Sequence, residues 1–361
     1  MSSATLLSDI EFYSGLFGPS GHEDLVIRAF AETVRALGYS ASVDALGNVT
    51  VPVREASAGY PTFAVTAHLD EIGFVVRDIG PAGWLYLNRI GGVNDRVVAG
   101  QRLQVRSDSG ELVEGHVGVK GAHVSTEAEL ATVVTVEEAY VDLLLSSREE
   151  VLAHGIRIGS PAAFVGPFSQ RGALLRGKAF DDRIGVAALL ELLRRLRDAD
   201  FGAGFTLIAT VQEEFSQRAG VPPVCAVRPD VLICLDIGLA ADSPDHNAGG
   251  PRLGEGPVIH GFTRGRTGGG LIPNPALVRY MADAAAKHDV PFVHSTLRGG
   301  LTDGSYMQYA GAGITTIDLA FPVRNAHTAV EVAHLSDVEH LVGLVAHAIT
   351  DAGRGQSFAR G

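Results

Sequence analysis

Four apolar runs of this chain each end beside acidic or histidine side chains, and this repeated pattern constrains the fold more than any other feature of the sequence. Such runs, rich in β-branched residues, are typical of strands in a sheet that is covered on both faces. The polar residues that follow them are His68 and Asp70 after FAVTA, Glu213 and Glu214 after FTLIATV, Asp236 after DVLICL, and His327 beyond ITTIDLAF. Because ligands of open α/β sheets bind beyond the carboxyl ends of the strands, we expect these side chains to meet at one edge.

The segments around these strands predict an α/β fold that is interrupted by a β-rich insertion. Helical patterns cover residues 6–37 in two pieces, return at 182–196 and recur toward the C-terminus. Within 72–165, short alternating runs separated by Gly, Asp, Ser and Asn are typical of a small β-barrel. We therefore predict a mixed sheet flanked by helices, formed by residues 1–71 and 166–361, with an inserted β-domain at 72–165.

Charge and composition exclude several classes of partner. The 361 residues include 29 Lys and Arg against 41 Asp and Glu, a net charge of −12, so the chain repels nucleic acid and anionic lipid. The chain contains no apolar run long enough to span a bilayer and no signal-peptide pattern, which predicts a cytoplasmic protein without membrane contact. Its two cysteines, Cys225 and Cys234, supply neither a disulfide framework nor a thiolate metal site.

The residue types at the strand ends predict a metal centre. Imidazoles and carboxylates without cysteine suit Zn²⁺ or Co²⁺, and also Mn²⁺. A further acidic pair, Asp181 and Asp182, precedes a predicted helix. Two divalent cations would balance the carboxylates of Asp181, Glu214 and Asp236 together with one bridging hydroxide. Without cations, carboxylates that converge in this way would repel one another at a high energetic cost.

The adjacent Glu213 and Glu214 take different roles in this hypothesis. Glu214 ligates a metal, whereas Glu213 is the general base that accepts a proton from metal-bound water, because coordination neutralises only one of the two carboxylates. Each residue alone also has a structural explanation. A buried histidine such as His68 is more often a core residue than a ligand, and paired glutamates are favoured at a helix N-terminus. Glu23 likewise stands at capping-box spacing from Ser20.

Six motifs in this order resemble the M42 family of metallopeptidases: AHLDEIGFVV, GKAFDDRIG, TVQEE, CLDIG, GEGPVI and RNAHT. The resemblance covers almost the whole chain, including GGVNDRVVAGQRLQV and SSREEVLAHGIRIG of the inserted segment. Family members are cytosolic, tetrahedral (TET-type) aminopeptidases with two metal ions, some of which have been described as endoglucanases. The resemblance implies a di-zinc exopeptidase-like α/β domain. It also implies a PDZ-like inserted domain that serves self-association, from a dimer to a tetrahedral dodecamer.

Position by position, the resemblance implies one metal held by His68, Asp181 and Asp236, and a second held by Asp181, Glu214 and His327. It implies Glu213 as the base and Asp70 as the partner of the far ring nitrogen of His68. The choice of Asp181 over Asp182 as the bridging ligand rests on this resemblance alone, because in related enzymes a cis peptide bond follows the bridging aspartate.

Two segments depart from the family pattern where the substrate side chain is expected. The segment EEFSQRAG replaces the usual Val-Gly-Leu-Arg-Gly after the paired glutamates, and GGLTDGS carries Leu301 as an insertion before Thr302 and Asp303. The ligand pattern is intact, so we expect the chemistry to be retained, whereas the preferred N-terminal residue stays open. His123 of the inserted segment could reach a neighbouring subunit's site, but we assign it no role.

These observations predict a metal-dependent aminopeptidase that hydrolyses the N-terminal bond of peptides through a hydroxide bridging two metals. The alternative is another di-metal amide hydrolase, a carboxypeptidase or an N-deacylase, in which Arg266, Arg298 or Arg324 would bind a substrate carboxylate. An endoglucanase is disfavoured because glycosidases place two carboxylates across a sugar and need no such metal cluster. A peptide-binding scaffold without activity is disfavoured by the complete set of ligands and base.

Overall fold

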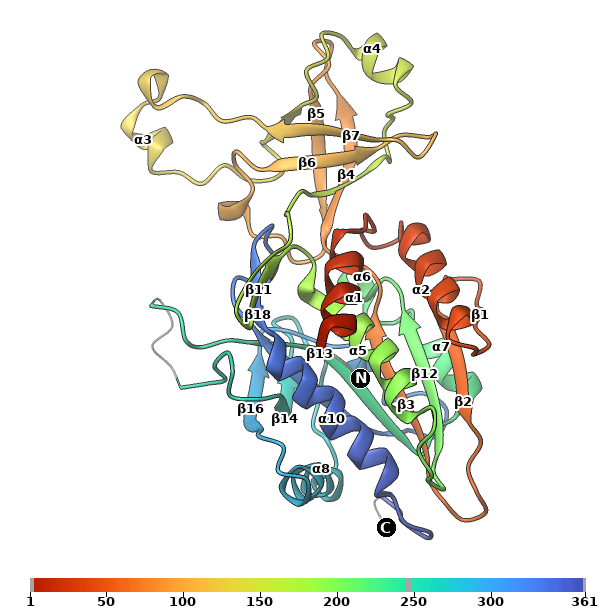
Figure 1. The fold of residues 1–361 in the computed structure, drawn as a ribbon. Coiled ribbons are helices and arrows are strands. Elements are labelled where there is room, and N and C mark those ends of the chain that lie inside the picture. The colour runs from red at the N-terminus through yellow and green to blue at the C-terminus, as the bar shows by residue number, and fades with distance from the viewer. Residues whose placement is uncertain (1–2, 245–248, 360–361) are drawn as a thin grey trace.

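Nine strands form the central sheet of the protein in the computed structural model, which describes residues 3–244 and 249–359 (Figure 1). Their order is β1 (Ser42–Val43), β2 (Val49–Arg54), β12 (Gly204–Thr210), β3 (Thr62–His68), β13 (Val231–Leu239), β17 (Thr315–Val323), β14 (Val258–Arg264) and β15 (Gly270–Leu271), and β16 (Val293–Arg298) pairs with β14. The central strands β12, β3, β13 and β17 run parallel, whereas β2 and β14 run antiparallel to their neighbours in this group. The predicted mixed sheet is confirmed.

The parallel centre of the sheet brings the expected polar residues to one edge. Thr210 at the end of β12 lies opposite His68 at the end of β3. Asp236 of β13 lies opposite Ala320 of β17. Because these four strands run parallel, their carboxyl ends all lie on the same side of the sheet. This edge faces the β-barrel, which lies above it in Figure 1.

Helices cover both faces of the sheet. The helices that contribute to the larger core are α1 (Ser3–Gly15), α2 (Asp24–Ala36), α5 (Phe180–Leu196), α8 (Pro275–Lys287) and α10 (Leu335–Thr350), while the shorter α7 (Val221–Val227) and α9 (Gly304–Met307) cover the opposite face. Strand β13 shows the division, because Ile233 and Leu235 belong to the larger core whereas Leu232 and Cys234 pack in a second cluster with Met307. A strand buried on both faces reads as a continuous apolar run.

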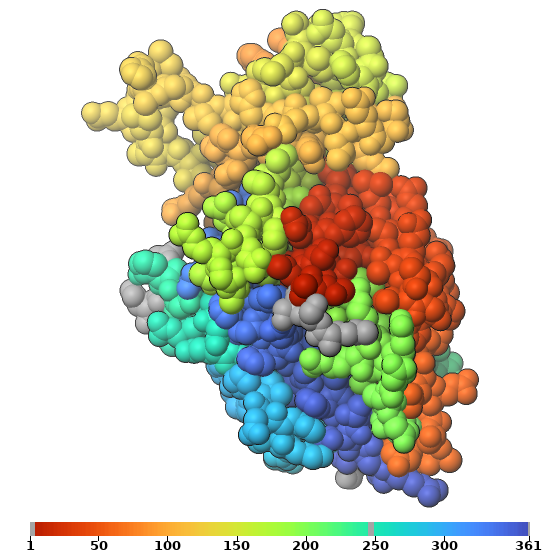
Figure 2. Space-filling view, viewed as in Figure 1, coloured from red at the N-terminus to blue at the C-terminus, as the bar shows by residue number. Residues whose placement is uncertain are grey.

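A closed β-barrel is inserted between β3 and the start of α5. Its strands are β4 (Gly73–Ile79), β5 (Leu85–Ile90), β6 (Arg102–Arg106), β7 (Leu112–Val117), β8 (Tyr140–Asp142) and β9 (Pro161–Phe164), and α3 (Glu127–Leu130) and α4 (Arg148–Ala153) lie in its connections. The barrel has a core of its own, which includes Phe74, Leu85, Leu103 and Val141. Figure 2 shows it as a lobe above the α/β body, with the segment around α3 projecting to one side. The predicted small barrel is confirmed.

A small three-stranded sheet lies between the barrel and the first turn of α5. It consists of β10 (Ser169–Arg171), β11 (Leu174–Gly177) and β18 (Glu331–His334), with β11 in the middle. Antiparallel pairing of β11 with β18 places Glu331 opposite Gly177, three residues before α5 begins. Segments that are about 150 residues apart in sequence therefore meet beside the carboxyl edge of the main sheet.

The interpretation of Ser20 and Glu23 as a capping box is wrong. Glu23 precedes α2, but its buried side chain makes no cap hydrogen bond to that helix. Its Oε1 atom instead accepts the backbone N–H of Gly21 at 2.8 Å and that of Gln212 at 3.0 Å. Since Gln212 precedes the paired glutamates, the carboxylate joins the N-terminal segment to the polar edge of the sheet.

The longest helices that the structure describes, α5 and α10, contain 17 and 16 residues. Within residues 3–244 and 249–359, no helix combines the length and the apolar character that crossing a membrane requires.

Candidate metal centre

The five predicted ligands form two groups that share one aspartate. The first group is His68, Asp181 and Asp236, and the second is Asp181, Glu214 and His327, with the candidate ligand atoms of each group within 4.8 Å of one another. Nε2 of His68 lies 3.0 Å from Oδ1 of Asp181, and Nε2 of His327 lies 3.2 Å from Oδ2 of the same residue. The two carboxylate oxygens of Asp181 thus face different groups.

Four of the five predicted ligands come from an element end or an irregular segment, and the fifth, Asp236, comes from inside a strand. His68 ends β3, and Asp236 lies within β13. Glu214 belongs to the single-turn helix α6 (Glu213–Ser216), which follows a left-handed residue, Gln212, at φ 56°. His327 lies in the loop after β17 and is itself left-handed, at φ 62°. Such conformations are uncommon for residues other than glycine and gather at functional sites.

Asp181 and Asp182 point in different directions. Asp181 lies in the non-helical start of α5, and the peptide bond between the two residues is cis. The carboxylate of Asp182 is fully buried, where it accepts the backbone N–H groups of His68 at 3.2 Å and Gly185 at 3.1 Å. The geometry therefore favours Asp181, and not Asp182, as the residue that two metals would share.

Asp70 contacts backbone more closely than it contacts His68. Its Oδ1 atom is 3.5 Å from Nδ1 of His68, which is longer than a good hydrogen bond. The same carboxylate accepts the N–H groups of Glu213 and Glu214, each at 3.0 Å. Asp70 was expected to orient His68, and the structure adds a second task, because Asp70 holds the turn that carries the paired glutamates.

The electrostatics of the cluster suit bound cations. Burial raises the pKa of Glu213 and of Asp236 well above the usual range, and neighbouring carboxylates raise it further, although His68 opposes them. Oε1 of Glu213 and Oε1 of Glu214 are buried without a hydrogen-bond partner among the described residues. Buried carboxylate oxygens that lack donors and repel one another are stabilised by divalent metal ions. The donor set of two imidazoles and three carboxylates fits Zn²⁺, Co²⁺ or Mn²⁺.

The barrel contributes a backbone contact to this cluster. Nδ1 of His327 lies 3.1 Å from the carbonyl oxygen of Gly92, in the loop after β5. When Nδ1 donates to that oxygen, Nε2 is left as the acceptor that faces Asp181 and Glu214. Neighbouring Gly91 lies against Glu214, since a Cβ atom there would be 3.2 Å from Oε2 of that residue.

If the group of Asp181, Glu214 and His327 holds a metal ion, replacing Gly92 with alanine is expected to weaken its binding by about tenfold to a hundredfold, the range seen when groups that support ligands are lost. A Cβ atom at this position would lie 2.7 Å from Nδ1 of His327, so the ring would have to move. The measurement is a titration with Co²⁺ followed by absorption. Gly121→Ala is the matched control in the barrel, because nothing lies within 4 Å of its added Cβ. Equal affinities in the two variants would contradict the prediction.

A buried polar network continues beside the cluster, on the face of the sheet covered by α9. Asp303 accepts the hydroxyl of Thr210 at 2.5 Å. Asp318 accepts the hydroxyls of Thr263 and Thr302, at 2.7 and 2.8 Å. Burial raises the pKa of Asp318 to about 6, although both hydroxyl groups lower it. The aspartate and the threonine of the GGLTDGS segment are therefore anchored in the core.

The buried Asp318 is expected to make the protein less stable as pH rises. Its pKa in the folded state, about 6, exceeds the ordinary 3.8, so its contribution is fully present below about pH 4 and is lost as pH rises through 6. That difference corresponds to at most about 3 kcal/mol. Asp318→Asn should therefore gain stability relative to wild type as pH rises from 4 to about 6, and keep that gain up to pH 8, in urea unfolding. An Asp283→Asn control changes an exposed residue, and a constant difference across this pH range would refute the prediction.

Of the three candidate residues for a substrate carboxylate, Arg324 is already paired with an aspartate. The guanidinium of Arg324 donates to both carboxylate oxygens of Asp242, at 2.6 Å each. Arg266 and Arg298 are exposed. His123 is also exposed, in a 3₁₀ turn of the barrel (Ala122–Val124).

Reasoning from the sequence missed three contributors to this site. Glu331 accepts backbone N–H groups of Asp181 and His327, Gly92 contacts the ring of His327, and Glu23 reaches Gln212. Among these three contributors, only Glu331 has a signal in the sequence, because it lies four residues after the predicted ligand His327. The contacts of Gly92 and Glu23 connect segments that are far apart in the chain, and no local pattern indicates them.

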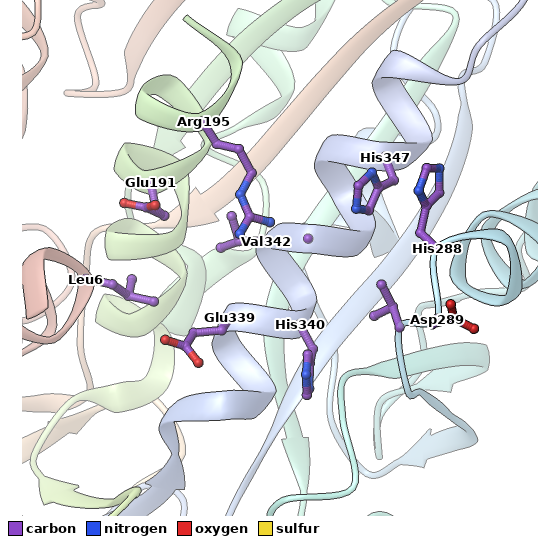
Figure 3. A pocket seen from close by; sticks show the side chains of 11 residues that line it. Leu6, Glu191, Arg195, His288, Asp289, Glu339, His340, Val342 and His347 are labelled. Carbon is purple, nitrogen blue, oxygen red and sulfur yellow. The ribbon is translucent and has the colours of Figure 1, made fainter. Parts of the chain in front are cut away.

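The cavity drawn in Figure 3 lies elsewhere, between α1, α5, α10 and the segment that follows α8, and has a volume of about 310 Å³. None of the seven predicted site residues lines it. The rings of His288 and His347 stack there, with centroids 3.7 Å apart, and Figure 3 shows them face to face. Among the described residues no group of three metal-ligating side chains forms at this cavity, so we do not treat it as the functional site.

Comparison with known proteins finds a matching family model, similar curated enzymes and similar solved structures. A family model described as M42 glutamyl aminopeptidase matches residues 47–344. The lysyl aminopeptidase of Pyrococcus furiosus is 31% identical over 331 residues, which cover 91% of this chain and 92% of that protein. The aminopeptidase APDkam598 of the archaeon Desulfurococcus kamchatkensis has a TM-score of 0.90 at 32% identity, covering 98% of this chain and 96% of that one.

A further solved structure extends the comparison. The TET1 peptidase of Pyrococcus horikoshii, which can assemble into a tetrahedron or a large octahedral shell, has a TM-score of 0.85 at 27% identity, covering 96% of this chain and 99% of that one. The fold and these relatives define an enzyme that hydrolyses peptide bonds. The chain belongs to the M42 glutamyl aminopeptidase family, which confirms the resemblance of the six sequence motifs.

Proposed function

We propose that the protein is an aminopeptidase that uses two divalent metal ions, Zn²⁺ or Co²⁺ with Mn²⁺ as an alternative. The observation that carries this proposal is the pair of ligand groups that share Asp181. His68 and Asp236 would complete the first site, and Glu214 and His327 the second. Bound there, the ions would supply Lewis acidity that polarises the scissile carbonyl and favours ionisation of water.

Glu213 is the general base in this proposal. Its carboxylate is buried beside the cluster, and one of its oxygens has no hydrogen-bond partner among the described residues. It would accept a proton from the attacking water and pass it to the leaving amine. Asp70 supports this role, because it holds the backbone of Glu213 and Glu214 and so keeps the two carboxylates on fixed positions of one turn.

Selectivity for a free N-terminus is the finer part of the proposal. A substrate α-amine would bind beside the metal pair, where carboxylates are concentrated, and the relatives named above are aminopeptidases. A carboxypeptidase or N-deacylase remains the alternative. Its support is reduced by Arg324, whose guanidinium is engaged by Asp242. Peptides with a free N-terminus are therefore the proposed substrates.

The insertion and the location of the protein complete the proposal. We assign residues 72–165 to a PDZ-like domain that serves self-association, and residues 1–71 and 166–361 to the catalytic domain. The six barrel strands lie between Gly73 and Phe164 and enclose a separate core. The tetrahedral and octahedral assemblies of the TET1 relative support self-association, and a related solved structure that is a dodecamer supports a dodecamer as the proposed form. A cytoplasmic protein agrees with the net charge and cysteine content.

The test is a mass-spectrometric time course on one peptide of mixed sequence, offered with a free or an acetylated N-terminus. The enzyme is supplied with Co²⁺ or Zn²⁺, or treated with a chelator. A ladder of products shortened from the free N-terminus, absent with chelator, is expected. Shortening from the C-terminus or loss of the acetyl group would favour the alternative hydrolases. No cleavage by a chain that also binds no metal would refute the proposal.

A further inference from the structure

The side chain of Glu331 spans two of the proposed ligands. Its Oε2 atom accepts the backbone N–H of Asp181 at 3.1 Å, and its Oε1 atom accepts that of His327 at 2.7 Å. The residue is 2% exposed, so water cannot replace these bonds easily. One carboxylate thus joins the start of α5 to the loop after β17.

The loop around His327 depends on this contact. The loop is closed by two backbone hydrogen bonds between Arg324 and Val332. Within it, Asn325 and His327 both have left-handed backbones, at φ 57° and 62°. Left-handed residues other than glycine persist only where the surroundings hold them. The bond from His327 to Glu331 is the shorter of the two bonds that the carboxylate makes.

Glu331 is itself fixed from outside the loop. It begins β18 and pairs with Gly177 of β11, which leads into the segment that carries Asp181. The same carboxylate therefore sets where both backbones lie. In the second ligand group, Nε2 of His327 lies 3.2 Å from Oδ2 of Asp181 and 3.2 Å from Oε1 of Glu214.

We propose that Glu331 is a positioning residue for the second metal site, because it fixes the separation of Asp181 and His327 through their backbone amides. The inference rests on the proposed function, since it takes the Asp181, Glu214 and His327 group as a metal site. Asp70 has a similar set of contacts, because its carboxylate also accepts two backbone N–H groups, those of Glu213 and Glu214. A carboxylate can accept both N–H groups at once, whereas a carboxamide has one acceptor oxygen and presents a donor to the other.

The test is Glu331→Gln in the full chain, titrated with Co²⁺ and followed by absorption and by equilibrium dialysis. One ion should bind with wild-type affinity, and the second should bind about tenfold to a hundredfold more weakly. Asp337→Asn is the matched control. Asp337 is also a fully buried carboxylate, and it accepts two backbone amides, those of Gly254 and Gly256, at 2.8 and 2.9 Å. This control should bind both ions as wild type does.

Two results would overturn the inference: unchanged binding of both ions by Glu331→Gln, or an equal loss in Asp337→Asn. If Glu331→Gln does not fold, Glu331→Asp takes its place. It keeps the charge but is one methylene too short to reach both amides, and it should weaken the second ion by a smaller factor. If wild type binds two ions and cleaves peptides, and the Glu331 variant also binds two ions with wild-type affinity, then the role of Glu331 is refuted and the proposed function stands. Wild type that binds fewer than two ions would overturn the two-metal proposal as well.

Discussion

Replacing Glu213 with glutamine is expected to lower kcat by about a hundredfold to ten-thousandfold while both metal ions stay bound, because the amide keeps the shape of the side chain but cannot accept the proton of the attacking water. Glu213 belongs to neither ligand group. Its backbone N–H would still bind Asp70, so the turn that carries Glu214 should be retained. The measurements are steady-state kinetics on a peptide and a count of bound metal.

A matched control separates chemistry from charge. Glu255→Gln makes the same change at an exposed residue and should leave kcat and metal content unchanged. If Glu213→Gln lost a metal ion together with its activity, Glu213 would be a ligand and not the base. If it kept activity within a few-fold of wild type, another group would have to move the proton.

Replacing Asp181 with asparagine is expected to have the other large effect, because this residue alone belongs to both ligand groups. Asparagine lacks the negative charge and presents only one oxygen, so neither site would keep its full ligand set. Binding of both ions should weaken by at least about a hundredfold, and peptidase activity should fall to background. The metal-dependent rise in Tm, which follows from selective binding to the folded state, should vanish too.

Two comparisons make this second prediction sharp. Wild type treated with a chelator should match Asp181→Asn in Tm and in activity. Asp182→Asn should lose some stability, because Asp182 accepts two buried backbone amides, yet it should still bind two ions. The reverse pattern, in which Asp182→Asn loses the metals and Asp181→Asn keeps them, would show that Asp182 bridges the sites.

Most of the site was predictable because its residues lie at the ends of apolar runs. His68, Glu214 and Asp236 follow apolar runs that predict strands buried on both faces, and parallel pairing brings the ends of such strands together. The structure extends one of these strands, β13, beyond Asp236 to Leu239. His327 lies farther from its strand, and its inclusion depended more on residue type and on family resemblance. The structure brings all five predicted ligands together in two groups that could hold metal ions.

The contacts that hold these ligands were not predictable. Nothing in the local sequence indicates that Glu23 reaches Gln212 instead of capping α2, or that Asp70 contacts the amides of Glu213 and Glu214 more closely than the ring of His68. These bonds join backbone groups to side chains over large sequence separations. They depend on how distant segments of the chain pack against one another, and no periodic pattern in the sequence predicts that packing.

The α/β class, the inserted barrel and the residue types of the candidate site could be predicted from the sequence, because hydrophobic periodicity and residue type are local properties. The tertiary structure supplies a geometric reason to favour Asp181 over Asp182 as the shared ligand, since both belong to one dipeptide and differ only in what surrounds them. It alone placed Glu331 between Asp181 and His327. A buried carboxylate binds whichever amides the fold brings to it, and that arrangement exists only after the distant segments have packed.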